Sequence, residues 1–329
     1  MRTAVLGSGS WGTALAQVLC DNQHTVRVWG IKETEVTEIN TLHTNSAYFG
    51  STPIAEGVVA TTDLAAALTG AETVVLCVPT KAMASVVKQA TPYLEPDALL
   101  VNAAKGFDPA TDLPMSETIR RTCANAHPVV SIVGPSHAEE VILRKLTSIC
   151  AVSPDETVAK QVQELFSNSY LRLYGMTDEV GAECGAAVKN VIALASGMLT
   201  GLGYGDNAKA ALITRGMQEI LRYGLSLGAK KDTFFGLTGV GDLIVTCFSP
   251  HSRNYQAGLA IGQADDAGAF LATNQKTVEG IYSCKVIAKE AEKRGIEMPI
   301  VSEVYRVLFE QEKPSVAVRT LMNRPLKAE

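Results

Sequence analysis

Hydrophobic residues in the first 175 positions gather in short runs, and alanine-rich amphipathic segments separate most of these runs. Strands spaced by helices pair in parallel, because a crossover helix is what joins parallel neighbours. The run at 73–78 is almost continuously apolar, which is typical of a strand covered on both faces of its sheet. The predicted strands are 3–6, 26–29, 74–78, 99–102, 129–133, 148–152 and 171–174. The predicted helices are 13–19, 64–68, 82–90, 115–123 and 156–166.

After Met176 the pattern changes, and long helical periodicities replace the strand-like runs. The predicted helices are 178–202, 206–227, one within 278–294, and 302–309. A chain of 329 residues is the length of about two domains. We therefore predict an α/β domain over residues 1–177 and a helical domain over residues 178–329.

Composition and charge exclude several classes of protein. Hydrophobic residues make up 47% of the chain and charged residues 19%, which indicates packed cores and not a disordered chain. The net charge of −5 argues against a nucleic-acid binder that depends on bulk positive charge. The seven cysteines are scattered without a C-x-x-C pair, which favours free thiols in a reducing compartment. No group of residues has metal-ligand spacing, so we expect no metal site.

The N-terminal apolar stretch resembles a signal peptide only at first sight. A signal needs a continuous apolar segment of about 7–15 residues, and residues 7–10 (Gly-Ser-Gly-Ser) interrupt this one. The later apolar runs contain Lys, Asn or Gly, which argues against a membrane span. We therefore expect a cytoplasmic protein.

A glycine-rich turn follows the first predicted strand and leads into a helix. Its sequence, Gly-Ser-Gly-Ser-Trp-Gly over residues 7–12, has the G-x-G-x-x-G spacing. Gly7 permits the tight turn, Gly9 lets a pyrophosphate approach the backbone, and Gly12 lets the helix pack closely on the strand. The start of the helix offers N–H groups and a positive dipole end to the phosphates. A dinucleotide is therefore the expected ligand, with FAD or a glycine-rich turn without a ligand as alternatives.

The end of the second strand leaves the choice of dinucleotide open. An acidic residue is expected there to hold the ribose 2′-hydroxyl of NAD, but the chain has Gly30, Ile31 and Lys32 before the first glutamate. Lys32 favours NADP if it meets a 2′-phosphate, and the alternative is a solvated surface lysine.

Two polar residues lie on an apolar face of the predicted helix 178–202. One turn away from Lys189 are small or apolar residues, Gly185 and Ile192 among them, and Asn190 has similar neighbours. Burial disfavours an ammonium group and lowers its pKa toward the range useful for proton transfer. Lys189 is therefore our candidate catalytic residue, and the alternative is a lysine whose charged head reaches water.

Two loops follow strands of the predicted parallel sheet at the edge where ligands bind in such folds. Lys105 follows strand 99–102, and Gly134 with Ser136 follows strand 129–133. We expect Ser136 to cap the next helix, and ordinary loop chemistry is the alternative for all three residues.

The helical half carries two further polar groups. Asp242 opens an apolar helix, with Thr246 one turn later on the same face, so the pair extends a polar site unless Asp242 is only a helix cap. Ser252, Arg253 and Asn254 begin the next helix, an arrangement that suits a phosphate because arginine offers a fork of donors. The alternative for these three is an exposed capping turn.

Taken together in order, these motifs resemble those of bacterial NAD(P)-dependent glycerol-3-phosphate dehydrogenases. The resemblance extends over nearly the whole chain. It rests on the segments 7–16 (GSGSWGTALA), 102–107 (NAAKGF), 133–138 (VGPSHA), 185–190 (GAAVKN), 201–206 (GLGYGD), 236–247 (GLTGVGDLIVTC), 252–254 (SRN) and 277–280 (TVEG).

The resemblance implies a Rossmann-type domain with a mostly parallel doubly wound sheet, followed by an all-α domain like that of 6-phosphogluconate dehydrogenase. It implies that Lys189 donates and accepts the proton at the substrate, with Lys105, Asn190 and Asp242 beside it. The implied dinucleotide contacts are Ser10, Trp11, Lys105, Ala138, Arg253, Val278 and Glu279. The implied substrate contacts are Lys105, Gly134, Ser136, Lys189, Asp242, Ser252, Arg253 and Asn254. Ile31-Lys32 departs from the family, which often has an arginine there.

The implied reaction is reversible hydride transfer between NAD(P)H and dihydroxyacetone phosphate, which gives sn-glycerol 3-phosphate for glycerophospholipid synthesis. We expect NAD or NADP as cofactor, a small phosphorylated substrate, no nucleic-acid partner and, as one option, a homodimer. Two alternatives are a two-domain reductase of the β-hydroxyacid or ketopantoate type and a dinucleotide-binding protein without catalysis.

Overall fold

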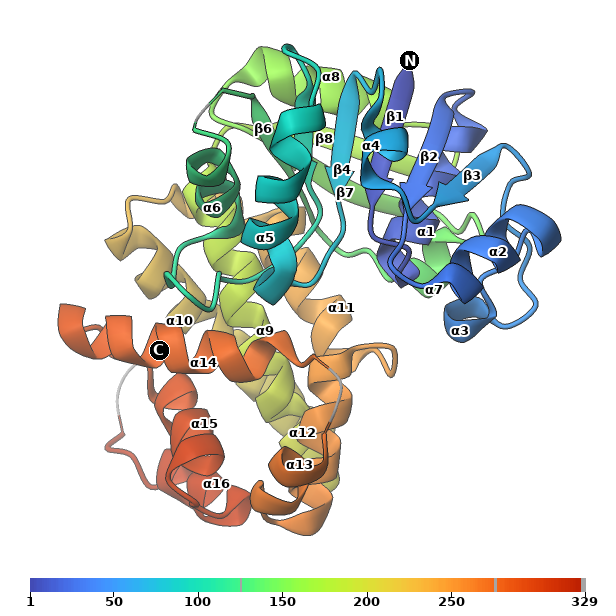
Figure 1. The fold of residues 1–329 in the computed structure, drawn as a ribbon. Coiled ribbons are helices and arrows are strands. Elements are labelled where there is room, and N and C mark those ends of the chain that lie inside the picture. The colour runs from blue at the N-terminus through green and yellow to red at the C-terminus, as the bar shows by residue number, and fades with distance from the viewer. Residues whose placement is uncertain (125, 275–276, 327–329) are drawn as a thin grey trace. The chain divides into compact units, whose positions relative to one another are not determined.

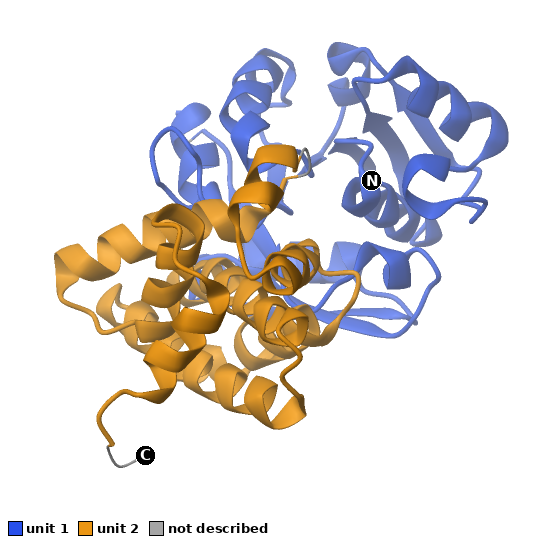
Figure 2. Ribbon diagram, turned by 90° about the horizontal axis from the view of Figure 1, so that it is seen from below, with its two compact units in different colours: residues 1–179 blue, residues 180–329 orange. Residues whose placement is uncertain are grey.

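The computed structural model describes residues 1–124, 126–274 and 277–326. The chain divides into two compact units, residues 1–179 (unit 1) and 180–329 (unit 2), shown in separate colours in Figure 2. The division falls in the first turn of the long helix α9 (Glu179–Gly201), next to the boundary predicted after residue 177.

Unit 1 contains one eight-stranded sheet with the order β3-β2-β1-β4-β5-β6-β7-β8 (Figure 1). The order reverses between β1 and β4, because the chain first builds outward on one side of β1 and then on the other. Ligands of open α/β sheets bind at such a switch point, beyond the carboxyl ends of the strands. The strands are β1 (Arg2–Leu6), β2 (Thr25–Trp29), β3 (Val58–Thr61), β4 (Thr73–Leu76), β5 (Leu99–Asn102), β6 (Val129–Val133), β7 (Thr147–Val152) and β8 (Leu171–Met176).

One strand of the sheet, β3 at its edge, was not predicted. Strands β6 and β7 pair antiparallel and every other described pair is parallel, so the sheet is mostly parallel, as expected. The connection from β6 to β7 contains a single short helix, Ala138–Val141, in place of a long crossover helix, so the chain turns back beside β6.

A hydrophobic core covers each face of the sheet. Neighbouring residues of a strand belong to different cores, because their side chains point to opposite faces. In β1, Val5 belongs to one hydrophobic core, while Ala4 and Leu6 belong to the other. Helices α1, α7 and α8 contribute to the first core, and α4, α5 and α6 to the second. The helices are α1 (Ser10–Asp21), α2 (Glu33–Leu42), α3 (Ser46–Phe49), α4 (Leu64–Leu68), α5 (Thr80–Ala90), α6 (Met115–Thr122), α7 (Ala138–Val141) and α8 (Glu156–Phe166).

Unit 2 is helical throughout the part that the structure describes. Helix α15 begins at Pro299 and not at residue 302 as predicted, since proline is well suited to the first position of a helix. The helices after α9 are α10 (Asp206–Ser226), α11 (Asp242–Phe248), α12 (Arg253–Ala264), α13 (Gly268–Thr273), α14 (Glu279–Arg294), α15 (Pro299–Phe309) and α16 (Pro314–Met322).

Helix α9 is the central helix of unit 2. By length and composition alone it could cross a membrane, but 83% of its most apolar window is buried inside the protein. Its backbone touches that of α12: a Cβ on Gly258 would lie 2.0 Å from the Leu194 carbonyl oxygen, and a Cβ on Gly197 would lie 2.1 Å from that of Tyr255. Only glycine allows this approach, which sets Asn190 of α9 beside Asn254 of α12.

All seven cysteines are free, as predicted. Burial raises the pKa of the Cys150 thiol to about 11 and that of Cys247 to about 12, so both remain protonated near neutral pH.

Candidate active site

The glycine turn, residues 7–12, joins β1 to α1 at the switch point of the sheet. Gly7 has a φ of +122°, a conformation that side chains strongly disfavour. A Cβ on Gly12 would lie 1.9 Å from the Gly7 carbonyl oxygen. A Cβ on Gly9 would meet nothing closer than the Tyr48 hydroxyl at 4.0 Å. The first and last glycines are therefore required by the protein itself, and the space over Gly9 is open to a ligand.

The start of α1 suits a pyrophosphate. The first turn of α1 carries no acidic residue, and no side chain caps it. Ser10 and Trp11 are the first two residues of the helix, and Trp11 also packs against the core beneath it. These features fit a dinucleotide, whose phosphates would meet backbone N–H groups and the positive end of the helix dipole.

A buried amide that the sequence reasoning missed holds the turn in shape. Asn45 is fully buried, and its Nδ2 donates to the Ser8 carbonyl oxygen at 2.8 Å and to Thr13 Oγ1 at 2.9 Å. It lies between the helices α2 and α3, neither of which was predicted, so nothing in the local pattern indicated it.

Lys32 forms an ion pair and is not simply solvated. Its Nζ lies 2.8 Å from Glu35 Oε1, and its side chain is 59% exposed. The hydrogen bond from Lys32 to this carboxylate raises the pKa of the lysine.

A second group of unit 1 residues meets at one carbonyl oxygen. Lys105 Nζ donates to the Gly134 oxygen at 2.8 Å, and Ser136 Oγ donates to the same oxygen at 3.0 Å. The prediction that Ser136 caps a helix is wrong: His137 occupies the position before α7, and its side chain makes no capping bond. Ala138 is the first residue of α7 and is buried.

In unit 2, Lys189 forms a buried cluster with two residues more than 50 positions away in the chain. Its Nζ donates to Asp242 Oδ1 and to Thr246 Oγ1, both at 2.8 Å. The side chains of Lys189 and Asp242 are only 5% and 2% exposed. The alternative of a lysine that reaches water is therefore wrong. We call Lys189, Asp242 and Thr246 the lysine cluster.

The lysine cluster changes the electrostatic argument. Burial alone disfavours the ammonium, whereas a carboxylate 2.8 Å away favours it. The sequence alone indicates only the burial of Lys189, not the carboxylate beside it. Within the cluster, Thr246 Oγ1 accepts from Lys189 and donates to the backbone carbonyl oxygen of Asp242 at 2.6 Å, so it ties the lysine to the first turn of α11.

A distorted turn directs Asp242 toward Lys189. Residues Leu237–Gly241 form a π-helical turn, a feature frequent at functional sites, and it runs directly into α11. Asp242 is the first residue of α11, not its cap, so the capping alternative is wrong. A Cβ on Gly185, one turn before Lys189, would lie 2.9 Å from the Thr238 carbonyl oxygen, so glycine is what admits the π-turn beside α9.

Asn190 and Asn254 contact each other. The Asn254 amide donates to Asn190 Oδ1 at 3.0 Å and accepts from the Gly280 N–H at 2.9 Å. These bonds join α9, α12 and the start of α14 beside the lysine cluster.

Ser252 caps the start of α12, which is the alternative considered for this residue, although Ser252 and Asn254 are buried and not exposed. Ser252 Oγ accepts from the Tyr255 N–H at 3.2 Å, and Arg253 is exposed at the first helical position. At the start of α14, Val278 is buried and Glu279 is half-buried. An exposed guanidinium at the positive end of a helix suits an anion.

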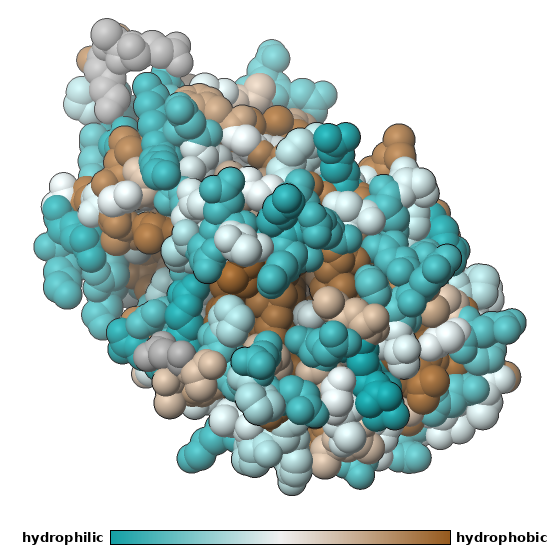
Figure 3. Space-filling model, turned by 90° about the horizontal axis from the view of Figure 1, so that it is seen from above, coloured by the Kyte–Doolittle hydropathy of each residue, from teal (hydrophilic) through white to brown (hydrophobic). Residues whose placement is uncertain are grey.

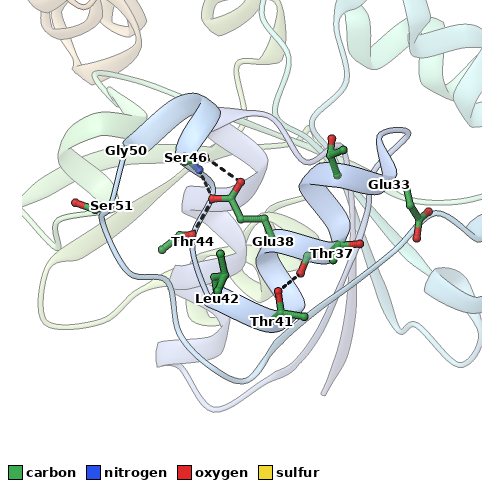
Figure 4. A pocket seen from close by; sticks show the side chains of 10 residues that line it. Glu33, Thr37, Glu38, Thr41, Leu42, Thr44, Ser46, Gly50 and Ser51 are labelled. Atoms are coloured by element: carbon green, nitrogen blue, oxygen red, sulfur yellow. Dashed lines mark hydrogen bonds between the residues drawn. The ribbon is translucent and has the colours of Figure 1, made fainter.

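A shallow pocket of about 760 Å³ lies elsewhere, over α2 and α3 in unit 1. Figure 4 shows the Glu38 carboxylate directed at Thr44 and Ser46, which donate to it at 2.7 and 3.0 Å. Glu33 and Glu38 line the pocket without a basic residue, so it does not suit a phosphate. Among the described residues, no group of three or more His, Cys, Asp or Glu side chains could hold a metal ion.

Comparison with known proteins places the chain in a family. Residues 2–159 match the N-terminal model of NAD-dependent glycerol-3-phosphate dehydrogenase, and residues 178–319 match its C-terminal model. Glycerol-3-phosphate dehydrogenase [NAD(P)+] of Listeria monocytogenes serotype 4a is 47% identical over 330 aligned positions, which cover 100% of this chain and 98% of that protein. The enzyme of that name from an Exiguobacterium species is 48% identical, with 99% and 96% covered.

Solved structures agree with this result. Glycerol-3-phosphate dehydrogenase of Coxiella burnetii superimposes with a TM-score of 0.91 at 34% identity, with 98% of this chain and 99% of that chain covered. A ketopantoate reductase from Ralstonia eutropha shares the fold at a TM-score of 0.63 and 15% identity, with 98% and 100% covered. The chain therefore belongs to the family of NAD(P)-dependent glycerol-3-phosphate dehydrogenases.

Proposed function

We propose that this protein is an oxidoreductase that catalyses reversible hydride transfer between NAD(P)H and dihydroxyacetone phosphate, with sn-glycerol 3-phosphate as the reduced product. The observation that carries the proposal is the buried lysine cluster, in a chain that also has an open glycine turn for a dinucleotide. Family membership supports the assignment. The bound nicotinamide supplies or accepts the hydride.

Lys189 is the proposed proton donor. As the carbonyl carbon is reduced, negative charge develops on its oxygen, and a fixed ammonium stabilises that charge and then gives up a proton. In the reverse direction the neutral amine takes the proton from the C2 hydroxyl. Asp242 and Thr246 hold the nitrogen in place, since each binds it at 2.8 Å.

Lys105 and the asparagine pair have supporting roles in this proposal. Lys105 adds positive charge near the reacting carbonyl, and the Gly134 carbonyl oxygen fixes its nitrogen. Asn190 orients the substrate, and its bond to Asn254 fixes its amide plane.

The substrate phosphate would bind at the start of α12. Arg253 offers an exposed fork of donors there, and the helix dipole adds to the attraction. Gly134, Ser136, Asp242, Ser252 and Asn254 are proposed as further substrate contacts, and Val278 and Glu279 as dinucleotide contacts. Binding of the remote phosphate positions the carbonyl for reaction, and the binding energy of the phosphate thereby increases the rate.

The glycine turn, with Ser10, Trp11 and Ala138, would hold the dinucleotide, which is NAD or NADP in this family. We propose a cytoplasmic enzyme whose product supplies glycerophospholipid synthesis. A homodimer stays a prediction. On the face shown in Figure 3, hydrophobic residues are interspersed with hydrophilic ones, so that view does not single out one partner surface.

Two other functions are less well supported. A reductase of the β-hydroxyacid or ketopantoate type acts on a substrate without phosphate and has no need of Arg253 at a helix start. A dinucleotide-binding protein without catalysis has no need of a lysine buried against a carboxylate.

The test is a spectrophotometric assay at 340 nm with dihydroxyacetone phosphate, run separately with NADH and NADPH. We expect oxidation of the cofactor with this ketone and little with unphosphorylated dihydroxyacetone. Equal use of the two ketones contradicts the phosphate assignment, and turnover of ketopantoate in preference to both selects the alternative reductase.

A further inference from the structure

A buried carboxylate links the glycine turn to the end of strand β2. Glu35 is the third residue of α2, and only 6% of it is exposed. Its Oε2 accepts from Ser8 Oγ at 2.7 Å, and its Oε1 accepts from Lys32 Nζ at 2.8 Å. Both carboxylate oxygens are therefore engaged, one by the turn and one by the lysine.

The approach depends on a glycine at the end of β2. A Cβ on Gly30 would lie 2.5 Å from Ser8 Oγ. Glycine leaves room for the serine hydroxyl, which then reaches Glu35 behind it. Ser8 is 5% exposed, so this hydrogen bond is shielded from water.

The end of the second strand is where a dinucleotide-binding fold distinguishes the two cofactors. A carboxylate there accepts from the 2′-hydroxyl of NAD, and a basic residue accommodates the 2′-phosphate of NADP. Here the carboxylate is buried with both oxygens engaged, whereas the ammonium of Lys32 is the exposed group.

The charge around Lys32 limits its attraction for a phosphate. Residues 30–42 contain this one basic residue and three glutamates, Glu33, Glu35 and Glu38. The contact with Glu35 makes the pair neutral overall. A nearby carboxylate also repels the 2′-phosphate directly.

We propose that Glu35 is a positioning residue that tunes the cofactor preference: it holds Lys32 at the 2′ position and offsets its charge, which weakens the preference for NADPH over NADH. The inference rests on the proposed function only in assuming that the ligand is a nicotinamide dinucleotide. A chain with a neutral residue at position 35 would favour NADPH more strongly.

The test uses two fragments that need no turnover, 5′-AMP and 2′,5′-ADP, which differ only in the 2′-phosphate. Their binding to the full-length protein is measured by calorimetry for the wild type and for Glu35→Gln, which keeps the size of the side chain and an oxygen for Ser8. We expect Glu35→Gln to bind 2′,5′-ADP about fivefold more tightly, the size of one exposed charge interaction, with 5′-AMP within about twofold of wild type.

Two control variants sharpen the result. Lys32→Met should weaken 2′,5′-ADP about fivefold and leave 5′-AMP unchanged. Ser8→Ala removes the hydroxyl and keeps the Lys32–Glu35 pair, so the ratio of the two affinities should stay at the wild-type value. The KM for NADPH should follow the changes in 2′,5′-ADP binding across these variants, and the KM for NADH should follow those in 5′-AMP binding.

Three outcomes would overturn the proposal. Weaker 5′-AMP binding in Glu35→Gln means that Glu35 itself binds the 2′-hydroxyl. Equal changes for both fragments mean a merely structural role. An unchanged 2′,5′-ADP affinity in Lys32→Met removes the lysine from the site. Because the fragments bind without reaction, a wild type that binds them but does not reduce dihydroxyacetone phosphate refutes the proposed function alone.

Discussion

The glycine turn and the lysine cluster are built in opposite ways. The turn consists of six consecutive residues, and its shape follows from the positive φ of Gly7 and the close approach at Gly12. The cluster brings Lys189 together with Asp242 and Thr246 from a different helix. The turn offers backbone N–H groups in open space, whereas the cluster holds a charged side chain away from water.

The difference predicts which property a substitution changes at each of the two sites. A backbone site depends on what is absent, a Cβ that would fill the ligand's place. A buried ion pair depends on both partners, because removing one leaves an uncompensated charge. Substitutions should therefore affect binding at the turn and chemistry at the cluster, and the variants below test that separation.

The largest expected effect is on turnover. Lys189→Met keeps the length of the side chain and removes the ammonium, so kcat should fall by about 10³-fold while dinucleotide affinity stays within about twofold. The measurements are the 340 nm assay and calorimetry with NADH. Because Asp242 then lacks its cation, Lys189→Met/Asp242→Asn is the control for folding. A near-normal kcat in Lys189→Met would remove the lysine from its role.

A buried carboxylate away from the cluster should make stability depend on pH. Glu219 of α10 is 1% exposed and accepts from the N–H groups of Ile300 and Val301 at the start of α15. Burial raises the pKa of Glu219 to about 7, although those two hydrogen bonds and nearby arginines lower it.

The direction in which stability changes with pH follows from the raised pKa of Glu219. The folded state favours the neutral acid, so the contribution of Glu219 is fully present below about pH 4.5 and is lost as the pH rises to about 7, by up to about 3 kcal/mol. The difference in unfolding free energy between wild type and Glu219→Gln, measured by urea denaturation from pH 4.5 to 8, isolates this group. A difference that does not vary with pH would show that Glu219 titrates normally.

The next effect concerns the substrate phosphate. Arg253→Ala should raise KM for dihydroxyacetone phosphate by about 10- to 100-fold, the range for one charged hydrogen-bonding group, with a smaller change in kcat. Unphosphorylated dihydroxyacetone is the control, and its kcat/KM should change by less than about twofold. An equal loss with both ketones would place Arg253 elsewhere in the mechanism.

The smallest expected effects are those of alanine substitutions at Gly9 and Gly12 of the turn, and the two should differ in kind. Gly9→Ala adds a methyl group in open space, so stability should hold while NADH affinity falls by about tenfold. Gly12→Ala places its methyl group against the Gly7 carbonyl and should lower the free energy of unfolding by about 1–3 kcal/mol. Thermal denaturation and calorimetry measure both variants. Unchanged NADH binding in Gly9→Ala would mean that no pyrophosphate lies over this glycine.

Much of the fold could be predicted because its elements have strong periodic signals. The helix at 156–166 and the strands at 99–102 and 129–133 have the predicted bounds. Helix α2 was missed because a glutamate is buried in it beside only two apolar residues, Val36 and Ile39. Burial of that glutamate, Glu35, depends on Ser8 and Lys32, which no periodicity reveals.

The sequence singled out individual residues of the candidate site but not their geometry. An apolar helix face singled out Lys189, and the spacing of Asp242 and Thr246 placed those two together. That both bind the lysine depends on the π-helical turn and on the close approach at Gly185, which are long-range features. The cap expected at Ser136 failed for a local reason: α7 begins at Ala138, after His137, and the Ser136 hydroxyl donates to the Gly134 carbonyl oxygen two residues earlier.

By itself the sequence determined the two-part organisation, the dinucleotide turn and the placement of Lys189 on an apolar helix face, because these depend on neighbours within a few positions. Only the tertiary structure decided which partners the buried charges have: Asp242 for Lys189, and Lys32 for Glu35. A buried charge must be compensated. The compensating group can lie far away in the sequence, and no local pattern encodes which residues packing brings together.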